Sequence, residues 1–219
     1  MKNNHEKNVL KKSAKESLKI ACDGIGSAVL GPVWEVKNFI KNCYGTYKEL
    51  SFDEFIKSMY GQFESRQATV EDINRYIEEL RKSNANQYIS NIIDSLFFSK
   101  CILASQILGL ITAKYLIDGD LDYCDLFLIS ALKDLYDEDI RNFMNLYHKL
   151  STAKNGLATL SNYSDKERVL LDKLQNLNIL GRDRATNRLC GSTLPLYFER
   201  TDVSIRLAEY YNLLASTYD

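Results

Sequence analysis

The 219-residue chain suits one large domain or two small ones, and its 45% hydrophobic residues can fill a core without disulfides or metal ions. Its 28 lysines and arginines are balanced by 29 aspartates and glutamates, which excludes a general attraction to nucleic acid or anionic lipid. Five scattered cysteines and a polar, basic N-terminus without an apolar signal core predict free thiols in the cytoplasm. No pattern in the sequence predicts a metal site or a cofactor.

Apolar residues recur three and four positions apart along most of the chain, which contains only two prolines, and this period predicts helices. A first, basic helix is expected from Glu6 to Cys22, ending before Gly24. The glycine-rich segment 23–32 is expected to form a hinge or a close-packed corner, and Pro32 then begins a second helix.

Capping boxes, in which a hydroxyl residue is followed three positions later by an acidic one, mark further helix starts. They occur at Ser51 with Glu54, at Thr69 with Asp72, and at Ser164 with Glu167. The longest helix is expected from Gln87 to Ile117. The membrane candidate within it is the apolar stretch from Leu96 to Ile117, but Lys100, Gln106 and Lys114 interrupt this stretch and leave only residues 101–113 without charge, too few to span a bilayer. It predicts the buried central helix of a soluble bundle and no transmembrane insertion.

The second half of the chain changes in character. Asp122 and Asp137 are each expected to begin a helix, and residues 118–122 are expected to form a turn, because the later positions of a calcium loop are missing. A basic loop, a short strand over 194–201 and a final helix over 203–214 follow. The sequence therefore predicts a mostly α protein: a helical domain over 1–120, and a domain over 121–219 that is helical to winged-helix-like, with a small α+β carboxy-terminal part.

One candidate catalytic pair lies in the expected helix after Asp137. Arg141, followed by Asn142, and His148 are seven residues apart and so share one helix face. This pattern resembles the Arg-(four to six residues)-His motif of HEPN ribonucleases, which are all-helical. The resemblance implies a homodimer in which Arg141 stabilises phosphate charge and His148 transfers protons. The alternative is an exposed helix in which Arg141 pairs with Asp137 or Glu138.

A second resemblance is carried by Asp23 and the sequence Glu35-Val36-Lys37. It is similar to the signature of the restriction-type nuclease fold, in which two carboxylates hold magnesium and a lysine orients water. That signature lies on strands, whereas residues 32–42 have helical spacing. We therefore predict no nuclease site of this type.

The tail offers a candidate nucleic-acid interface. Its expected order of helix, turn, basic hairpin and short strand is similar to a winged helix. The cations that would contact phosphate are Lys166, Arg168, Lys173, Arg182, Arg184 and Arg188. Asp165, Glu167 and Asp172 share the same helix and make the surface mixed, which predicts weak, salt-dependent binding. The alternative is a winged fold that contacts a protein or serves only as packing.

The order of elements from the long helix to the end of the chain resembles bacterial abortive-infection alpha-like proteins, which help cells to resist phage. Those proteins also begin with a glycine-containing apolar segment, comparable to residues 24–34, and end in a Tyr-x-x-Thr-x-x-Gly run. Tyr197, Phe198 and Thr201 match that run loosely, while Ser204 stands where glycine is usual. The resemblance implies a non-enzymatic protein that binds a protein partner in bacterium–phage conflict, as a defence component or a phage-borne antagonist. The alternatives are the HEPN-like ribonuclease and a winged-helix DNA-binding regulator.

Overall fold

The computed structural model describes residues 46–69, 71–72, 75, 86–151, 157–160, 163–182 and 196–218. The helices are α3 (Thr46–Ser65), α5 (Asn86–Phe98), α6 (Ile102–Asp118), α7 (Tyr123–Leu132), α8 (Asp137–Ser151), α9 (Asp165–Asn176) and α10 (Asp202–Tyr218). The strands are β1 (Leu157–Leu160), β2 (Leu180–Arg182) and β3 (Leu196–Arg200). The predicted class, mostly helical with a small mixed C-terminal part, is therefore confirmed.

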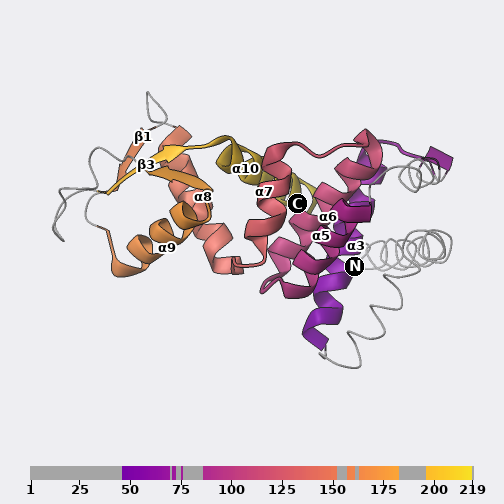
Figure 1. Cartoon of the computed structure of the whole chain (residues 1–219), viewed down its shortest axis with the longest axis horizontal. Helices are drawn as coiled ribbons and strands as arrows, with labels where there is room; N and C mark the ends of the chain where they lie inside the picture. The colour runs from indigo at the N-terminus through magenta and orange to yellow at the C-terminus, as the bar shows by residue number, and fades with distance from the viewer. Residues whose placement is uncertain are drawn as a thin grey trace, which may run out of the picture.

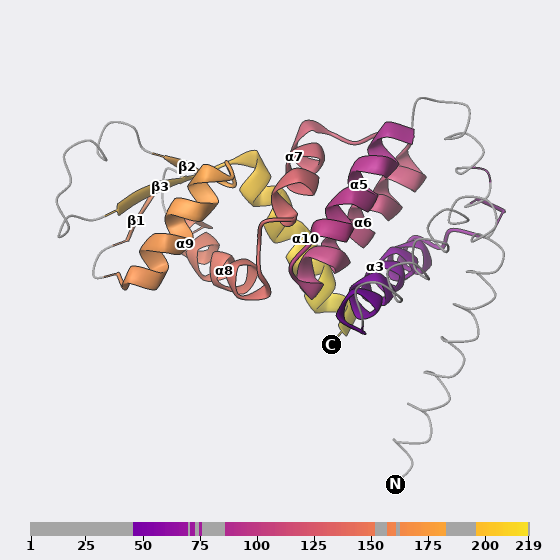
Figure 2. The same cartoon turned by 60° about the horizontal axis from the view of Figure 1, so that its bottom comes forward.

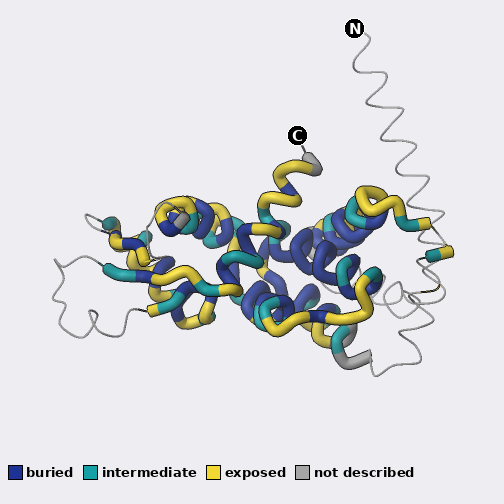
Figure 3. The backbone as a smooth tube through the Cα atoms, turned by 90° about the horizontal axis from the view of Figure 1, so that it is seen from above, coloured by how far each residue is buried: buried dark blue, intermediate teal, exposed yellow. Residues whose placement is uncertain are grey.

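The elements are arranged along one long axis (Figure 1). Helices α3, α5 and α6 lie together at one end, and α8, α9 and the sheet lie at the other (Figure 2). Helices α7 and α10 lie between these two parts. One cluster of buried hydrophobic residues extends from Phe52 on α3 to Leu214 on α10, so both parts share a core (Figure 3).

Helix α6 is the central helix of the bundle, and most of its residues are buried. Among the described residues, no helix is both long enough and apolar enough to cross a bilayer. Gly109 on α6 contacts α3 so closely that an added Cβ would lie 2.3 Å from the carbonyl oxygen of Phe55. The absence of a side chain at Gly109 allows the two helix backbones to approach, and this contact joins the first described helix to the core.

The expected continuous helix from Gln87 to Ile117 is wrong, because the chain breaks between α5 and α6. Cys101 takes an extended conformation as the N-cap of α6, and its Sγ accepts a hydrogen bond from the amide of Ala104 at 3.3 Å. A distant residue completes the new helix start, since Asp137 Oδ1 accepts from the amide of Leu103 at 2.8 Å. Helical periodicity continues through the break because both helices bury apolar residues in the same core.

The Cys101 thiol is expected to be unreactive in the folded protein. Burial, as the main cause, raises the pKa of this thiol to about 12. The attacking species is the thiolate, so alkylation by iodoacetamide at pH 8 is expected to be slower in the native chain than in the unfolded chain by on the order of 10³-fold. Mass spectrometry of the peptide that contains Cys101, with and without guanidinium, measures this ratio. Equal rates in both conditions would contradict the buried cap.

The predicted helix starts are confirmed where a complete local capping pattern is present. At α9, Ser164 and Glu167 form both bonds of a capping box. Thr69 and Asp72 form the same pair of bonds, each at 3.1 Å. The prediction at Ser51 is wrong, because α3 begins five residues earlier, at Thr46, and Ser51 is buried inside it.

Asp122 and Asp137 begin helices as predicted, and a short non-helical connection over residues 119–122 joins α6 to α7 where the turn was expected. Gly119 takes a left-handed conformation with φ of 76° at the end of α6. In the described part of the chain, no group of His, Cys, Asp or Glu side chains is arranged to hold a metal ion.

Helix α10 is joined to α6 and α7 by a group of charged and polar side chains that no local sequence pattern predicts. Asp125 on α7 is fully buried and forms a salt bridge with Lys114 of α6. Its other carboxylate oxygen accepts a hydrogen bond from Tyr210 Oη of α10 at 2.8 Å and lies 3.6 Å from Arg206 Nε. Arg206 also pairs with Asp122 at 2.5 Å. We call these five residues the Asp125 network.

Protonation within the Asp125 network is unambiguous at Tyr210. Burial, reinforced by the carboxylate of Asp125, raises the pKa of Tyr210 above its ordinary value, so its hydroxyl remains a donor. Burial raises the pKa of Asp122, but hydrogen bonds from the Asp125 amide and the Lys114 side chain, together with the positive charges of Lys114 and Arg206, hold it below its usual value. Tyr210 is therefore the neutral hydrogen-bond donor of the network, and Asp122 is ionised at neutral pH.

The strands form an antiparallel sheet in the order β1-β3-β2. The register pairs Ala158 with Phe198 in one ladder and Arg182 with Phe198 in the other. The short strand expected over 194–201 is confirmed as β3, whereas β1 and β2 were not predicted. Four-residue and three-residue strands leave too short a pattern for alternation to be recognised.

Ser204 has a local structural role at the start of α10. Ser204 donates its amide to Thr201 Oγ1 at 3.0 Å, and the amide of Thr201 donates to Ser204 Oγ at the same distance. These reciprocal bonds cap the first turn of α10. Thr201 Oγ1 also donates to the carbonyl of Ile179 at 2.6 Å and so attaches the start of α10 to the turn between α9 and β2.

Candidate functional site: the pocket between α9 and the sheet

Helix α9 is held in position by buried apolar side chains and by the side-chain amide of a buried glutamine. Leu170, Leu171 and Leu174 are buried against the rest of the C-terminal part. Gln175 is also buried, and its Nε2 donates to the carbonyl oxygens of Gly181 and Tyr197 at 3.3 and 3.4 Å. One side chain thereby links α9 to both β2 and β3, which fixes the space between the helix and the sheet.

A pocket of about 210 Å³ lies in this space. Helix α9 supplies Arg168, Leu171, Asp172 and Gln175, β2 supplies Arg182, and β3 supplies Leu196 and Tyr197. We call this the α9 pocket. Its lining combines two guanidinium groups and one carboxylate with apolar and aromatic surface, which is a composition suited to a ligand with both charged and apolar groups.

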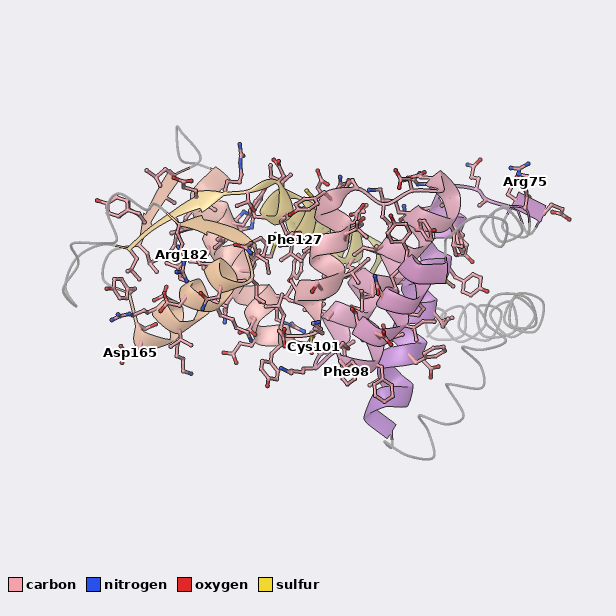
Figure 4. The ribbon with its side chains drawn as sticks, in the orientation of Figure 1. Arg75, Phe98, Cys101, Phe127, Asp165 and Arg182 are labelled. Atoms are coloured by element: carbon pink, nitrogen blue, oxygen red, sulfur yellow. The ribbon has the colours of Figure 1, made fainter. Side chains whose placement is uncertain are left out.

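Arg182 reaches back from β2 to the C-terminal end of α9, where it donates a hydrogen bond to Asn176 Oδ1. Figure 4 shows Arg182 beside this end of the helix and Asp165 at the opposite end. Since the asparagine amide is neutral, the charge of Arg182 is not compensated there. Within the described residues, neither Arg168 nor Arg182 forms a salt bridge.

The other cations predicted for a nucleic-acid interface are not gathered at the α9 pocket. Lys173 turns away to form a salt bridge with Asp139 of α8 at 2.5 Å, and it lies 4.7 Å from the ring centre of Tyr136. Lys166 is exposed near the start of α9. Arg184 and Arg188 lie outside the described residues, as do Asp23, Glu35 and the expected basic N-terminal helix.

Arg141 and His148 are both exposed on α8. Two helical turns separate them, which is about 10 Å along the helix axis. The expected pairing of Arg141 with Asp137 or Glu138 is wrong for the described residues: Asp137 instead accepts from the amide of Leu103, and no ion pair of Arg141 is formed. Arg141 is thus available for a phosphate, as the HEPN resemblance requires, but neither residue lines the α9 pocket.

The sequence pattern predicts Arg168 and Arg182 as functional residues, but it does not predict the other residues that line the α9 pocket. From the sequence, Asp172 is expected only to weaken a DNA-binding surface, and no local pattern indicates a role for Gln175. A glutamine on the apolar side of an amphipathic helix could have indicated this site, because a buried amide requires hydrogen-bond partners.

The chain was compared with protein-family models, with curated proteins and with solved structures. None of them matches it.

Proposed function

We propose that this chain is a non-enzymatic interaction protein of bacterium–phage conflict, acting in the cytoplasm, and that it contacts a protein partner through α9. The observation that carries the proposal is the exposed face of α9, on which Val169 is 66% exposed between charges of both signs. Mixed charge around an exposed apolar residue suits a protein interface with an apolar centre and a polar rim. The role in phage conflict rests on the resemblance to abortive-infection alpha-like proteins.

Two features favour protein over DNA as the partner of α9. Asp165 and Asp172 are exposed on the same helix as Lys166 and Arg168, so the local charges cancel and attraction to a polyanion is small. A helix-turn-helix needs two helices joined by a short turn. In the described residues α9 is preceded by strand β1, so α9 is not the second helix of such a unit.

Phage plating tests the proposal. A defence component is expected to lower the efficiency of plating when expressed alone, whereas an antagonist is expected to restore plating on a strain that carries an independent defence system. Val169→Glu is expected to remove either effect, because burying an unpaired carboxylate at an interface costs about 2 kcal/mol or more, or at least about thirtyfold in affinity. Glutamate keeps the helix propensity of α9, so stability should be unchanged.

A ribonuclease is the second candidate function, and the exposed, unpaired Arg141 on the same helix as His148 favours it. Arg141→Ala and His148→Ala are therefore the matched variants in the plating assay, and both are expected to behave like the unmodified chain. If both lose the effect while Val169→Glu keeps it, the HEPN-like ribonuclease replaces the interaction protein. If no form of the chain alters plating on either strain, the role in phage conflict is wrong.

A further inference from the structure

The α9 pocket has a surplus of positive charge. Arg168 and Arg182 enter it from different elements, and guanidinium groups remain charged at any physiological pH. Among the described residues that line the pocket, Asp172 is the single carboxylate; it lies one helical turn from Arg168, yet the two side chains are too far apart to form a salt bridge. Two positive charges against one negative charge make a site for a ligand group that carries one negative charge.

The size of the pocket limits the size of the ligand that carries this negatively charged group. Sites for drug-sized ligands have volumes of about 300–1,000 Å³. The α9 pocket is smaller, at about 210 Å³, and therefore accommodates one side chain of a larger partner more readily than a whole cofactor. The sheet and α9 hold its walls in place through Gln175, so the ligand enters a preformed space.

The chemistry of the lining selects among side chains. Two guanidinium groups can donate charge-assisted hydrogen bonds to one carboxylate. Leu171, Leu196 and Tyr197 offer apolar surface for the methylene groups that precede it. Asp172 repels a second acidic group beside the first, so a run of negative charges fits less well than an isolated one.

We propose that the α9 pocket binds a single glutamate or aspartate side chain of the protein partner, with its carboxylate between Arg168 and Arg182. This inference rests on the proposed function and specifies the chemistry of the partner. The partner segment carries one acidic residue among apolar neighbours, and Asp172 excludes phosphate chains and acidic runs.

The test measures fluorescence anisotropy of a labelled nine-residue peptide that has one glutamate between leucines, added to the full chain. We expect saturable binding that is lost when the glutamate is replaced by glutamine. Arg168→Gln and Arg182→Gln are each expected to weaken binding by about ten- to hundredfold, as for the loss of a charge-assisted hydrogen bond. Arg200→Gln, which removes an exposed arginine of β3 outside the pocket, is the matched control and should have no effect.

Asp172→Asn should increase the affinity for the peptide, because it removes the carboxylate that repels acidic groups. The increase should be largest for a peptide with three glutamates. A residue with a merely structural role would not produce such an increase. Equal binding of the glutamate and glutamine peptides would overturn the proposal. Stronger competition by oligothymidylate than by unlabelled peptide would overturn it in favour of nucleic acid. If plating depends on Val169 but the peptide does not bind, the assignment of the pocket is wrong while the proposed function stands.

Discussion

Replacing Gly109 with alanine is expected to destabilise the chain by roughly 3 kcal/mol or more, the upper range for forcing an extra group into a packed core. The added Cβ would lie 2.3 Å from the carbonyl oxygen of Phe55 and 3.1 Å from the amide nitrogen of Met59. Both are backbone atoms of α3, so relief requires the two helices to separate. The higher helix propensity of alanine offsets only about 1 kcal/mol of this cost.

Thermal unfolding followed by circular dichroism measures the effect of Gly109→Ala. For a chain of this size, a loss of 3 kcal/mol lowers the melting temperature by about 6–12 °C. Gly119→Ala is the matched control, because it makes the same substitution where no atom lies within 4 Å of the added Cβ but φ is 76°. That variant should lose only about 1–2 kcal/mol through backbone strain. A larger loss at Gly119 than at Gly109 would contradict the close contact between α3 and α6.

Replacing Asp125 with alanine is expected to cost about 3–5 kcal/mol, the usual effect of removing one partner from a buried ion pair. Asp125 is fully buried and is contacted by Lys114, Arg206 and Tyr210. Its removal leaves two positive charges without their buried counterion and one buried hydroxyl without its acceptor. Because these partners come from α6 and α10, the contact between the C-terminal helix and the bundle should be the first to weaken.

Denaturant unfolding and amide hydrogen exchange along α10 measure this loss. Asp118→Ala is the matched control, since its salt bridge to Arg66 is exposed at both ends and is expected to contribute less than about 1 kcal/mol. Tyr210→Phe removes only the hydroxyl and should cost about 1–3 kcal/mol, by leaving an acceptor unsatisfied. If Asp125→Ala is no more destabilising than Asp118→Ala, the Asp125 network does not hold α10 in place.

Features whose cause lies within a few consecutive residues could be predicted from the amino-acid sequence. The starts of α7 at Asp122 and of α9 at Ser164 could be predicted because a cap is made by a side chain and an amide two or three residues further on. The helical class followed from apolar spacing, and strand β3 followed from a short run of strand-forming residues. These signals do not depend on how the chain folds back on itself.

Tertiary structure decided the features that depend on residues far apart in the chain. The helix start after the break before α6 is completed by Asp137. Ser51 lies inside helix α3, whose Glu54 accepts a hydrogen bond from Gln106 of α6. Strand β1 pairs with the distant β3. The candidate site follows the same rule: Lys173 is occupied by Asp139, and Arg168 meets Arg182 only because Gln175 attaches α9 to the sheet. Cationic side chains on the same helix therefore differ in the residues that they contact, and the packing of the whole chain determines these contacts.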